Sequence, residues 1–143
     1  MITVVKVLFI CHGNICRSPM AEFIMKDLVK KAGRESEFII DSAAVTQEEL
    51  GHDMYPPAKR KLREKGIPFA PRHARQITAE DIKTYDFIIY MDAWNGQILR
   101  NRYPRGHFAA LLDRDVDDPW YTGDFETAYQ DIHAGCVRLL EVL

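Results

Sequence analysis

A cysteine and an arginine separated by five residues form a segment that could bind and attack a phosphate group. Cys11 and Arg17 enclose most of the sequence CHGNICRSP (residues 11–19), which directly follows an apolar run. Five intervening residues let the backbone curl once around a tetrahedral oxyanion, with the sulfur beneath it and the guanidinium fork across the rim. The N–H groups of such a turn form an anion nest, and the helix that follows adds its positive N-terminal end. The same field favours a thiolate, which is the nucleophilic form of cysteine.

The residues inside this segment suit a phosphate-binding loop. The main-chain amides from His12 to Arg17 are expected to donate hydrogen bonds to the phosphoryl oxygens, as an oxyanion hole does. Gly13 allows close approach of the backbone, and Asn14 tolerates a left-handed conformation better than most residues. The predicted phosphate-binding positions are therefore His12, Gly13, Asn14, Ile15, Cys16 and Ser18. Ser18 is also a good N-cap for a helix whose first position is Pro19.

Composition restricts the class of protein. The chain has 143 residues, a length typical of one domain that can build a core without disulfides or metal, so residues 1–143 are expected to form a single domain. A net charge of −2 argues against nucleic acid as a partner, and no apolar run reaches the ~20 residues that span a bilayer. The five histidines include no pair at metal-ligand spacing, so neither a metal nor a cofactor is expected. Three cysteines do not make a secreted disulfide framework, which favours a reduced, cytoplasmic protein.

Strands and helices alternate along the chain, which predicts an α/β fold with parallel strands. Strands are expected over residues 4–10, 38–40, 86–91 and 108–112, with helices starting near residues 18, 57, 78, 94 and 125. The prediction is a single-domain, three-layer fold: a central four-stranded parallel sheet flanked by helices, with the phosphate-binding loop after the first strand. Ligands bind beyond the carboxyl ends of such strands. Cys11, Ser42, Asp92 and the segment 113–118 each follow or end a predicted strand, so they should converge at one edge.

The pattern Cys-x-Gly-Asn-x-Cys-Arg-Ser-Pro between a strand and a helix closely resembles the signature of the low-molecular-weight protein tyrosine phosphatases. The resemblance covers nearly the whole chain and is weakest over residues 45–57. It implies hydrolysis of phosphotyrosine and aryl phosphates through a cysteinyl-phosphate intermediate, with Cys11 as nucleophile and Arg17 as phosphate clamp. The family carries its general acid and base in an Asp-Pro followed by two aromatics, which is matched here at Asp118. Trp120 and Tyr121 would then form the wall of the substrate pocket.

The resemblance also implies supporting residues. Ser42 matches a serine that hydrogen-bonds the loop asparagine, Ser18 matches one that hydrogen-bonds the thiolate, and Asp92 is placed to orient the arginine. Glu48 stands where many members carry an aromatic pocket wall. Arg72 occupies the position of a family histidine, with His73 displaced by one residue. The implied partner is a phosphotyrosine-containing protein substrate, and the enzyme is expected to be a monomer or a weak dimer.

Three other functions fit the sequence less well than a tyrosine phosphatase does. Arsenate reductases on the same scaffold need a cysteine pair near the middle of the chain, but no cysteine lies between Gly33 and Cys136. A non-catalytic phosphotyrosine-binding module should have lost the nucleophile, the arginine or the acid, yet all three are present. The acidic run from Asp113 lacks the glycine and glutamate of a calcium loop. For Cys16 two interpretations stay open: a small packed residue, or a partner that forms a reversible disulfide with Cys11.

Overall fold

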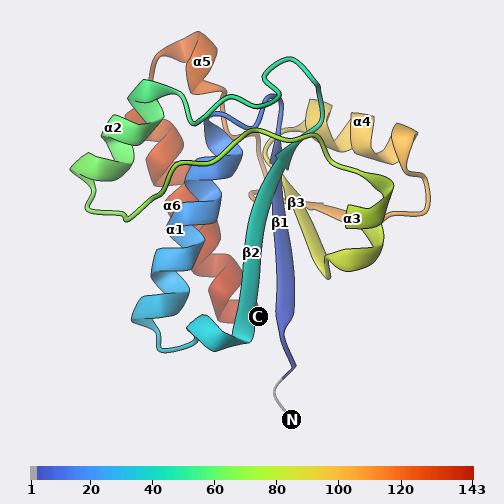
Figure 1. Cartoon of the computed structure of the whole chain (residues 1–143), viewed down its shortest axis with the longest axis horizontal. Helices are drawn as coiled ribbons and strands as arrows, with labels where there is room; N and C mark the ends of the chain where they lie inside the picture. The colour runs from blue at the N-terminus through green and yellow to red at the C-terminus, as the bar shows by residue number, and fades with distance from the viewer. Residues whose placement is uncertain (1–2) are drawn as a thin grey trace.

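A parallel sheet of four strands, in the order β2-β1-β3-β4, forms the centre of the protein (Figure 1). The computed structural model describes residues 3–143, so Met1 and Ile2 of the expected domain lie outside the described residues. The strands are β1 (Val5–Cys11), β2 (Phe38–Ala44), β3 (Phe87–Tyr90) and β4 (Phe108–Ala110). All pairings are parallel, and the predicted α/β architecture is confirmed.

Helices cover both faces of the sheet and complete the three layers (Figure 1). They are α1 (Arg17–Lys31), α2 (Pro56–Glu64), α3 (Ala79–Thr84), α4 (Ala93–Arg102), α5 (Pro119–Thr122) and α6 (Phe125–Val142), with a short 3₁₀ turn at Glu35–Glu37. Helices α1 and α6 pack together on one face, while α3 and α4 lie on the other (Figure 1). Within residues 3–143, no helix is both long and apolar enough to cross a membrane.

From Val7 to Cys11, strand β1 is buried on both of its faces, which explains the continuous apolar sequence of this part. Val7 and Phe9 belong to the core cluster formed with α1 and α6, whereas Leu8 and Ile10 belong to the cluster on the α3 and α4 side. A parallel strand covered on both faces has no polar side to present to solvent. Cys11, the last residue of β1, is therefore held at the centre of the sheet edge where the ligand site was expected.

The boundaries differ from the predicted ones at several places. Helix α1 begins at Arg17, with Cys16 as its N-cap and no side-chain capping bond, so Ser18 does not cap this helix as its sequence position suggested. Strand β2 continues to Ala44, where it forms a bridge with Gln76, and β4 ends at Ala110 rather than 112. The predicted start of α3 is confirmed, because Thr78 and Asp81 form a capping box.

Candidate active site

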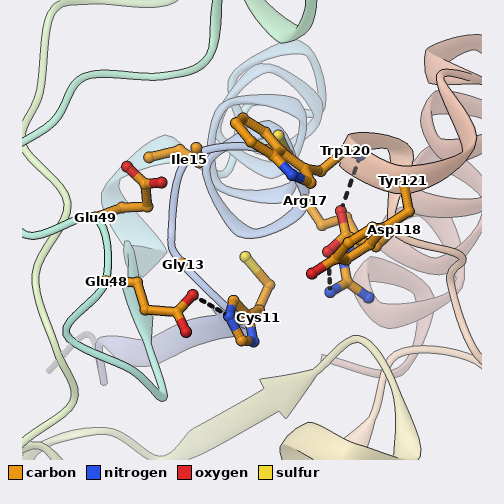
Figure 2. A pocket seen from close by; sticks show the side chains of 11 residues that line it. Cys11, Gly13, Ile15, Arg17, Glu48, Glu49, Asp118, Trp120 and Tyr121 are labelled. Carbon is orange, nitrogen blue, oxygen red and sulfur yellow. Dashed lines mark hydrogen bonds and ion pairs between the residues drawn. The ribbon is translucent and has the colours of Figure 1, made fainter.

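A pocket of about 130 Å³ lies at the carboxyl end of β1 and contains most of the residues singled out in the sequence (Figure 2). Cys11 is at its floor with 3% of its surface exposed, whereas Trp120 and Tyr121 are 48% and 80% exposed at its mouth. The lining residues are Cys11, His12, Gly13, Ile15, Cys16, Arg17, Glu48, Glu49, Asp118, Trp120 and Tyr121. The pocket is therefore narrow and polar at the base, with aromatic rings at the entrance.

The loop between β1 and α1 is curled as its sequence predicted. Asn14 adopts φ 60°, a left-handed conformation that asparagine tolerates. The carbonyls of Cys11, His12 and Ile15 accept hydrogen bonds from main-chain N–H groups of residues 45, 46 and 55 at 3.0, 3.2 and 2.8 Å. These bonds tie the loop carbonyls to the neighbouring segment. The amides of the loop and the N-terminus of α1 are then available to an anion in the pocket.

The side chain of Asn14 holds this loop in shape. Its amide nitrogen donates to the hydroxyl oxygens of Ser18 and Ser42, at 2.8 and 3.0 Å. Its carbonyl oxygen accepts from the guanidinium of Arg72 and from the main-chain N–H of Arg75. Asn14 is completely buried, so these contacts satisfy an amide that has no access to water. The predicted contact between Ser42 and Asn14 is present.

Ser18 connects this network to the cysteine. Its hydroxyl oxygen lies 3.0 Å from the sulfur of Cys11. That oxygen accepts a hydrogen bond from Asn14, and its single hydrogen can be donated either to the sulfur at 3.0 Å or to the carbonyl of Ala43 at the longer distance of 3.5 Å. A thiolate at Cys11 would accept this bond. Ser18 thus lies where the resemblance placed it, in contact with the sulfur.

Arg17 is buried to 2% exposure and is surrounded by acceptors. One terminal nitrogen donates to Asp92 at 2.7 Å and to the carbonyl of Val116 at 2.8 Å, and the other donates to Asp118 at 3.3 Å. Burial alone lowers the pKa of Arg17, but Cys11, Asp118 and Asp92 more than offset this and raise it above the usual value. Its Nε has no hydrogen-bond partner among residues 3–143, so this donor is available to a ligand.

Asp118 sits at the N-terminus of α5, where Pro119 opens the helix. One carboxylate oxygen accepts the main-chain N–H of Trp120 at 3.0 Å, and the other faces Arg17. Its side chain retains 20% exposure, enough to reach a bound molecule. Figure 2 shows Asp118 and Tyr121 together at one side of the pocket, with Trp120 next to them. This arrangement places one carboxyl group in the same pocket as Cys11 and beside the guanidinium.

Two supporting residues were missed in the sequence. Arg72 contacts Asn14, whereas the Nδ1 of His73 contacts the carbonyl of Gly51 at 2.9 Å, so the arginine and not the shifted histidine reaches the loop. Burial lowers the pKa of Arg72, against the opposing influence of Glu22 and Cys11. Glu22 accepts the hydroxyl of Ser42 at 2.6 Å and is 6% exposed. Its position four residues after Ser18, on the same face of α1, is the signal that could have identified it.

The mouth of the pocket carries two acidic side chains. Glu48 was expected there, and its carboxylate lies 2.5 Å from Nε2 of His12. Glu49 lines the same pocket and contacts Nδ1 of His52 at 2.6 Å. No sequence motif points to this residue. Both residues lie on the side of Cys11 away from Tyr121 (Figure 2).

The other two cysteines differ from Cys11 in their surroundings. Cys16 and Cys136 are free and buried, and burial is the main cause that raises the pKa of each thiol above its usual range. Cys11 and Asp118 raise the pKa of Cys16 further. Both thiols are thus protonated at neutral pH, and the disulfide between Cys11 and Cys16 stays a prediction.

Comparison with known proteins identifies the class to which this fold and site belong. The family described as low molecular weight phosphotyrosine protein phosphatase matches residues 6–143. The chain is 42% identical to the low molecular weight protein-tyrosine-phosphatase YfkJ of Bacillus subtilis and 37% identical to the low molecular weight phosphotyrosine protein phosphatase of Sus scrofa, covering 95% of this chain and 94% of each relative. The crystal structure of YfkJ covers 98% of this chain and 94% of its own, with a TM-score of 0.93 and 41% identity. This chain belongs to the low molecular weight phosphotyrosine protein phosphatase family.

Replacing Asn14 with glycine isolates the work of its side chain, because glycine adopts φ 60° without strain. We expect Asn14→Gly to fold but to lower kcat/KM for 4-nitrophenyl phosphate about tenfold, since each lost hydrogen bond is worth roughly 0.5–1.5 kcal/mol. Asn14→Ala is the matched control, which adds backbone strain and should have a lower Tm than the glycine variant. Unchanged activity in Asn14→Gly would show that the loop keeps its shape without the amide.

Proposed function

We propose that this enzyme hydrolyses phosphotyrosine in protein substrates, with Cys11, Arg17 and Asp118 as its catalytic residues. The observation that carries the proposal is their placement in one pocket: the sulfur of Cys11 lies at the floor, 3.0 Å from the Ser18 hydroxyl, and Arg17 is paired with Asp118 in the same pocket. A nucleophile, a cation for the phosphoryl oxygens and a proton donor are the three groups that phosphoester cleavage requires.

In the first step the Cys11 thiolate attacks phosphorus. A sulfur–phosphorus bond forms while the bond between phosphorus and the phenolic oxygen breaks, and Asp118 gives its proton to that oxygen. The planar fork of Arg17 and the amides of residues 12–17 hold the phosphoryl oxygens as negative charge redistributes. Asp92 and Val116 support this role, because their bonds to one terminal nitrogen fix the orientation of the guanidinium.

In the second step a water molecule replaces the sulfur. Asp118, now ionised, takes a proton from this water, and the oxygen forms a bond to phosphorus as the sulfur–phosphorus bond breaks. Inorganic phosphate and the Cys11 thiolate are the products. The hydroxyl of Ser18 stabilises that thiolate by donating a hydrogen bond to it.

The depth of the pocket supports a preference for aryl phosphates. Cys11 is almost completely buried, whereas Trp120 and Tyr121 stand exposed at the entrance. A phenyl phosphate is long enough to reach the sulfur and presents its ring to these aromatic faces, which adds roughly 0.5–1.5 kcal/mol beyond area burial. A phosphoserine or phosphothreonine is too short for the same approach.

Two competing functions are less well supported. Arsenate reduction needs a second pair of cysteines, and none lies between Gly33 and Cys136. A binding module has no use for an acid, yet Asp118 faces Arg17 above the cysteine. We further propose that the enzyme acts in the cytoplasm, since its three cysteines are free thiols. Its expected state is a monomer or a weak dimer, as the family resemblance implies.

Cys11→Ser tests the nucleophile. We expect loss of at least about 10³-fold in turnover of 4-nitrophenyl phosphate, because a hydroxyl is rarely ionised at neutral pH, with inorganic phosphate still bound. Phosphate binding by calorimetry and Tm by circular dichroism check that the loop and the fold persist. A rate within tenfold of wild type refutes the role of Cys11.

Asp118→Asn tests the general acid. We expect kcat for a phosphotyrosine peptide to fall about 10²–10⁴-fold, the usual contribution of a general acid. The loss should shrink for an aryl phosphate whose leaving group is strongly acidic, because that group departs without a proton. Asp117→Asn is the matched control on an exposed neighbour. A larger effect at Asp117, or equal losses for both substrates, contradicts the assignment.

Ile15 lines the pocket, and its apolar side chain is expected to favour phosphotyrosine over phosphoarginine. Relatives that act on phosphoarginine resemble this loop but carry threonine at that position. The methyl groups of Ile15 offer no hydrogen bond to a guanidinium, which would lose its water without replacement. We therefore expect kcat/KM for phosphotyrosine to exceed that for phosphoarginine in matched peptides, and Ile15→Thr to narrow the difference. Equal values in the wild-type enzyme refute the role given to Ile15.

A further inference from the structure

The two carboxylates at the pocket mouth, Glu48 and Glu49, are held in place by their surroundings. Glu48 contacts His12, whose ring lies 5.0 Å from the ring of Trp94 on α4. Glu49 contacts His52 and packs over the loop, since a Cβ added at Gly13 would lie 3.1 Å from the Glu49 Cγ. These contacts place both carboxylates at the pocket mouth.

Their negative charge is not balanced by a lysine or arginine. Among the ion pairs of the described residues, Glu48 and Glu49 have only histidine partners. Arg17 is the one Lys or Arg that lines the pocket within this part of the chain, and it is buried and engaged by Asp92 and Asp118. The mouth is thus acidic while the floor is built for an anion.

This division of charge affects the two parts of a substrate differently. The phosphate reaches the amides and the guanidinium at the floor, whereas the peptide on either side of the phosphotyrosine crosses the mouth. Glu48 keeps 65% of its side chain exposed there, and Glu49 keeps 27%. The two carboxylates would repel an Asp or Glu next to the phosphotyrosine. They would attract a Lys or Arg at the same place, because neither is paired with a lysine or arginine of the enzyme.

We infer that Glu48 and Glu49 select substrates in which Lys or Arg directly flanks the phosphotyrosine. The inference rests on the proposed phosphotyrosine phosphatase function and adds the charge of the substrate sequence to it. Exposed ion pairs are weak, so each carboxylate should change kcat/KM about two- to fivefold. The Debye length is about 8 Å at physiological ionic strength and shorter at higher salt, so added salt reduces the preference.

The test measures kcat/KM for three phosphotyrosine peptides that differ only in carrying Lys, Gln or Glu on both sides of the phosphotyrosine, with 4-nitrophenyl phosphate as a substrate without neighbours. At low salt the wild-type enzyme should prefer Lys over Gln over Glu, with about a tenfold range that narrows as sodium chloride is added. The double variant Glu48→Gln, Glu49→Gln should lose most of this range, and Glu48→Lys with Glu49→Lys should reverse the order. The ratio between peptides within one variant is the quantity compared, since it cancels any effect on the chemical step.

Glu141→Gln on the exposed face of α6 is the control for overall charge and should keep the wild-type range. If all three peptides have equal kcat/KM in the wild-type enzyme, or the double glutamine variant keeps the full range, the inference is wrong while the phosphatase function stands. If neither 4-nitrophenyl phosphate nor any peptide is hydrolysed, the proposed function itself fails, and the inference fails with it.

Discussion

The burial of one positive charge organises the active site. Arg17 is 2% exposed, and an unpaired cation at such a depth would cost many kcal/mol in lost hydration. Its partners, Asp92, Val116 and Asp118, lie 75, 99 and 101 residues further along the chain. Two segments that are remote in sequence, one at Asp92 and one at residues 116–118, therefore close over the guanidinium in the folded protein. The same closure brings the carboxyl group of Asp118 next to Arg17 in the pocket that contains Cys11.

A second constraint comes from the polar groups beneath the loop. Asn14 is buried with its amide in contact with Ser18, Ser42, Arg72 and the main chain of residue 75. Ser42 then contacts Glu22, which pairs with Lys26 at 2.6 Å. Such a network stabilises one conformation when its members are satisfied. Within residues 3–143, the one buried side-chain polar atom of this network without a partner is Nη1 of Arg72. The loop is thereby prepared for an anion, and little ordering is left for the moment of binding.

Most of the residues proposed for catalysis could be selected from the sequence because they lie in short local motifs. One short segment between a strand and a helix contains Cys11, Gly13, Asn14 and Arg17. The succession of strands along the chain follows from apolar runs separated by turns. A serine before proline is typical of a helix N-cap, which is why the sequence predicts that role for Ser18. In the structure Cys16 is the N-cap, and the hydroxyl of Ser18 contacts the sulfur of Cys11 instead.

The residues that were missed depend on contacts between remote segments. Arg72 reaches Asn14 across 58 positions. Its position matches a family histidine, but that match does not indicate that an arginine there would contact Asn14. Glu49 has the appearance of an ordinary surface residue until the chain folds it over Gly13. Strand ends were displaced by up to four residues, at β2, because residues 41–44 continue the parallel pairing with β1 as far as Cys11.

Asp92 performs two tasks with its two oxygens. One accepts the main-chain N–H of Asn95 and caps α4, while the other holds Arg17. Asparagine caps a helix about as well as aspartate, but it cannot neutralise a buried guanidinium. Capping alone would therefore leave the choice between these two residues open, and the charge is what the catalytic cation requires. A substitution of Asp92 therefore alters the stability of α4 and the position of Arg17 together, so at this residue selection for stability and selection for reaction rate act on the same side chain.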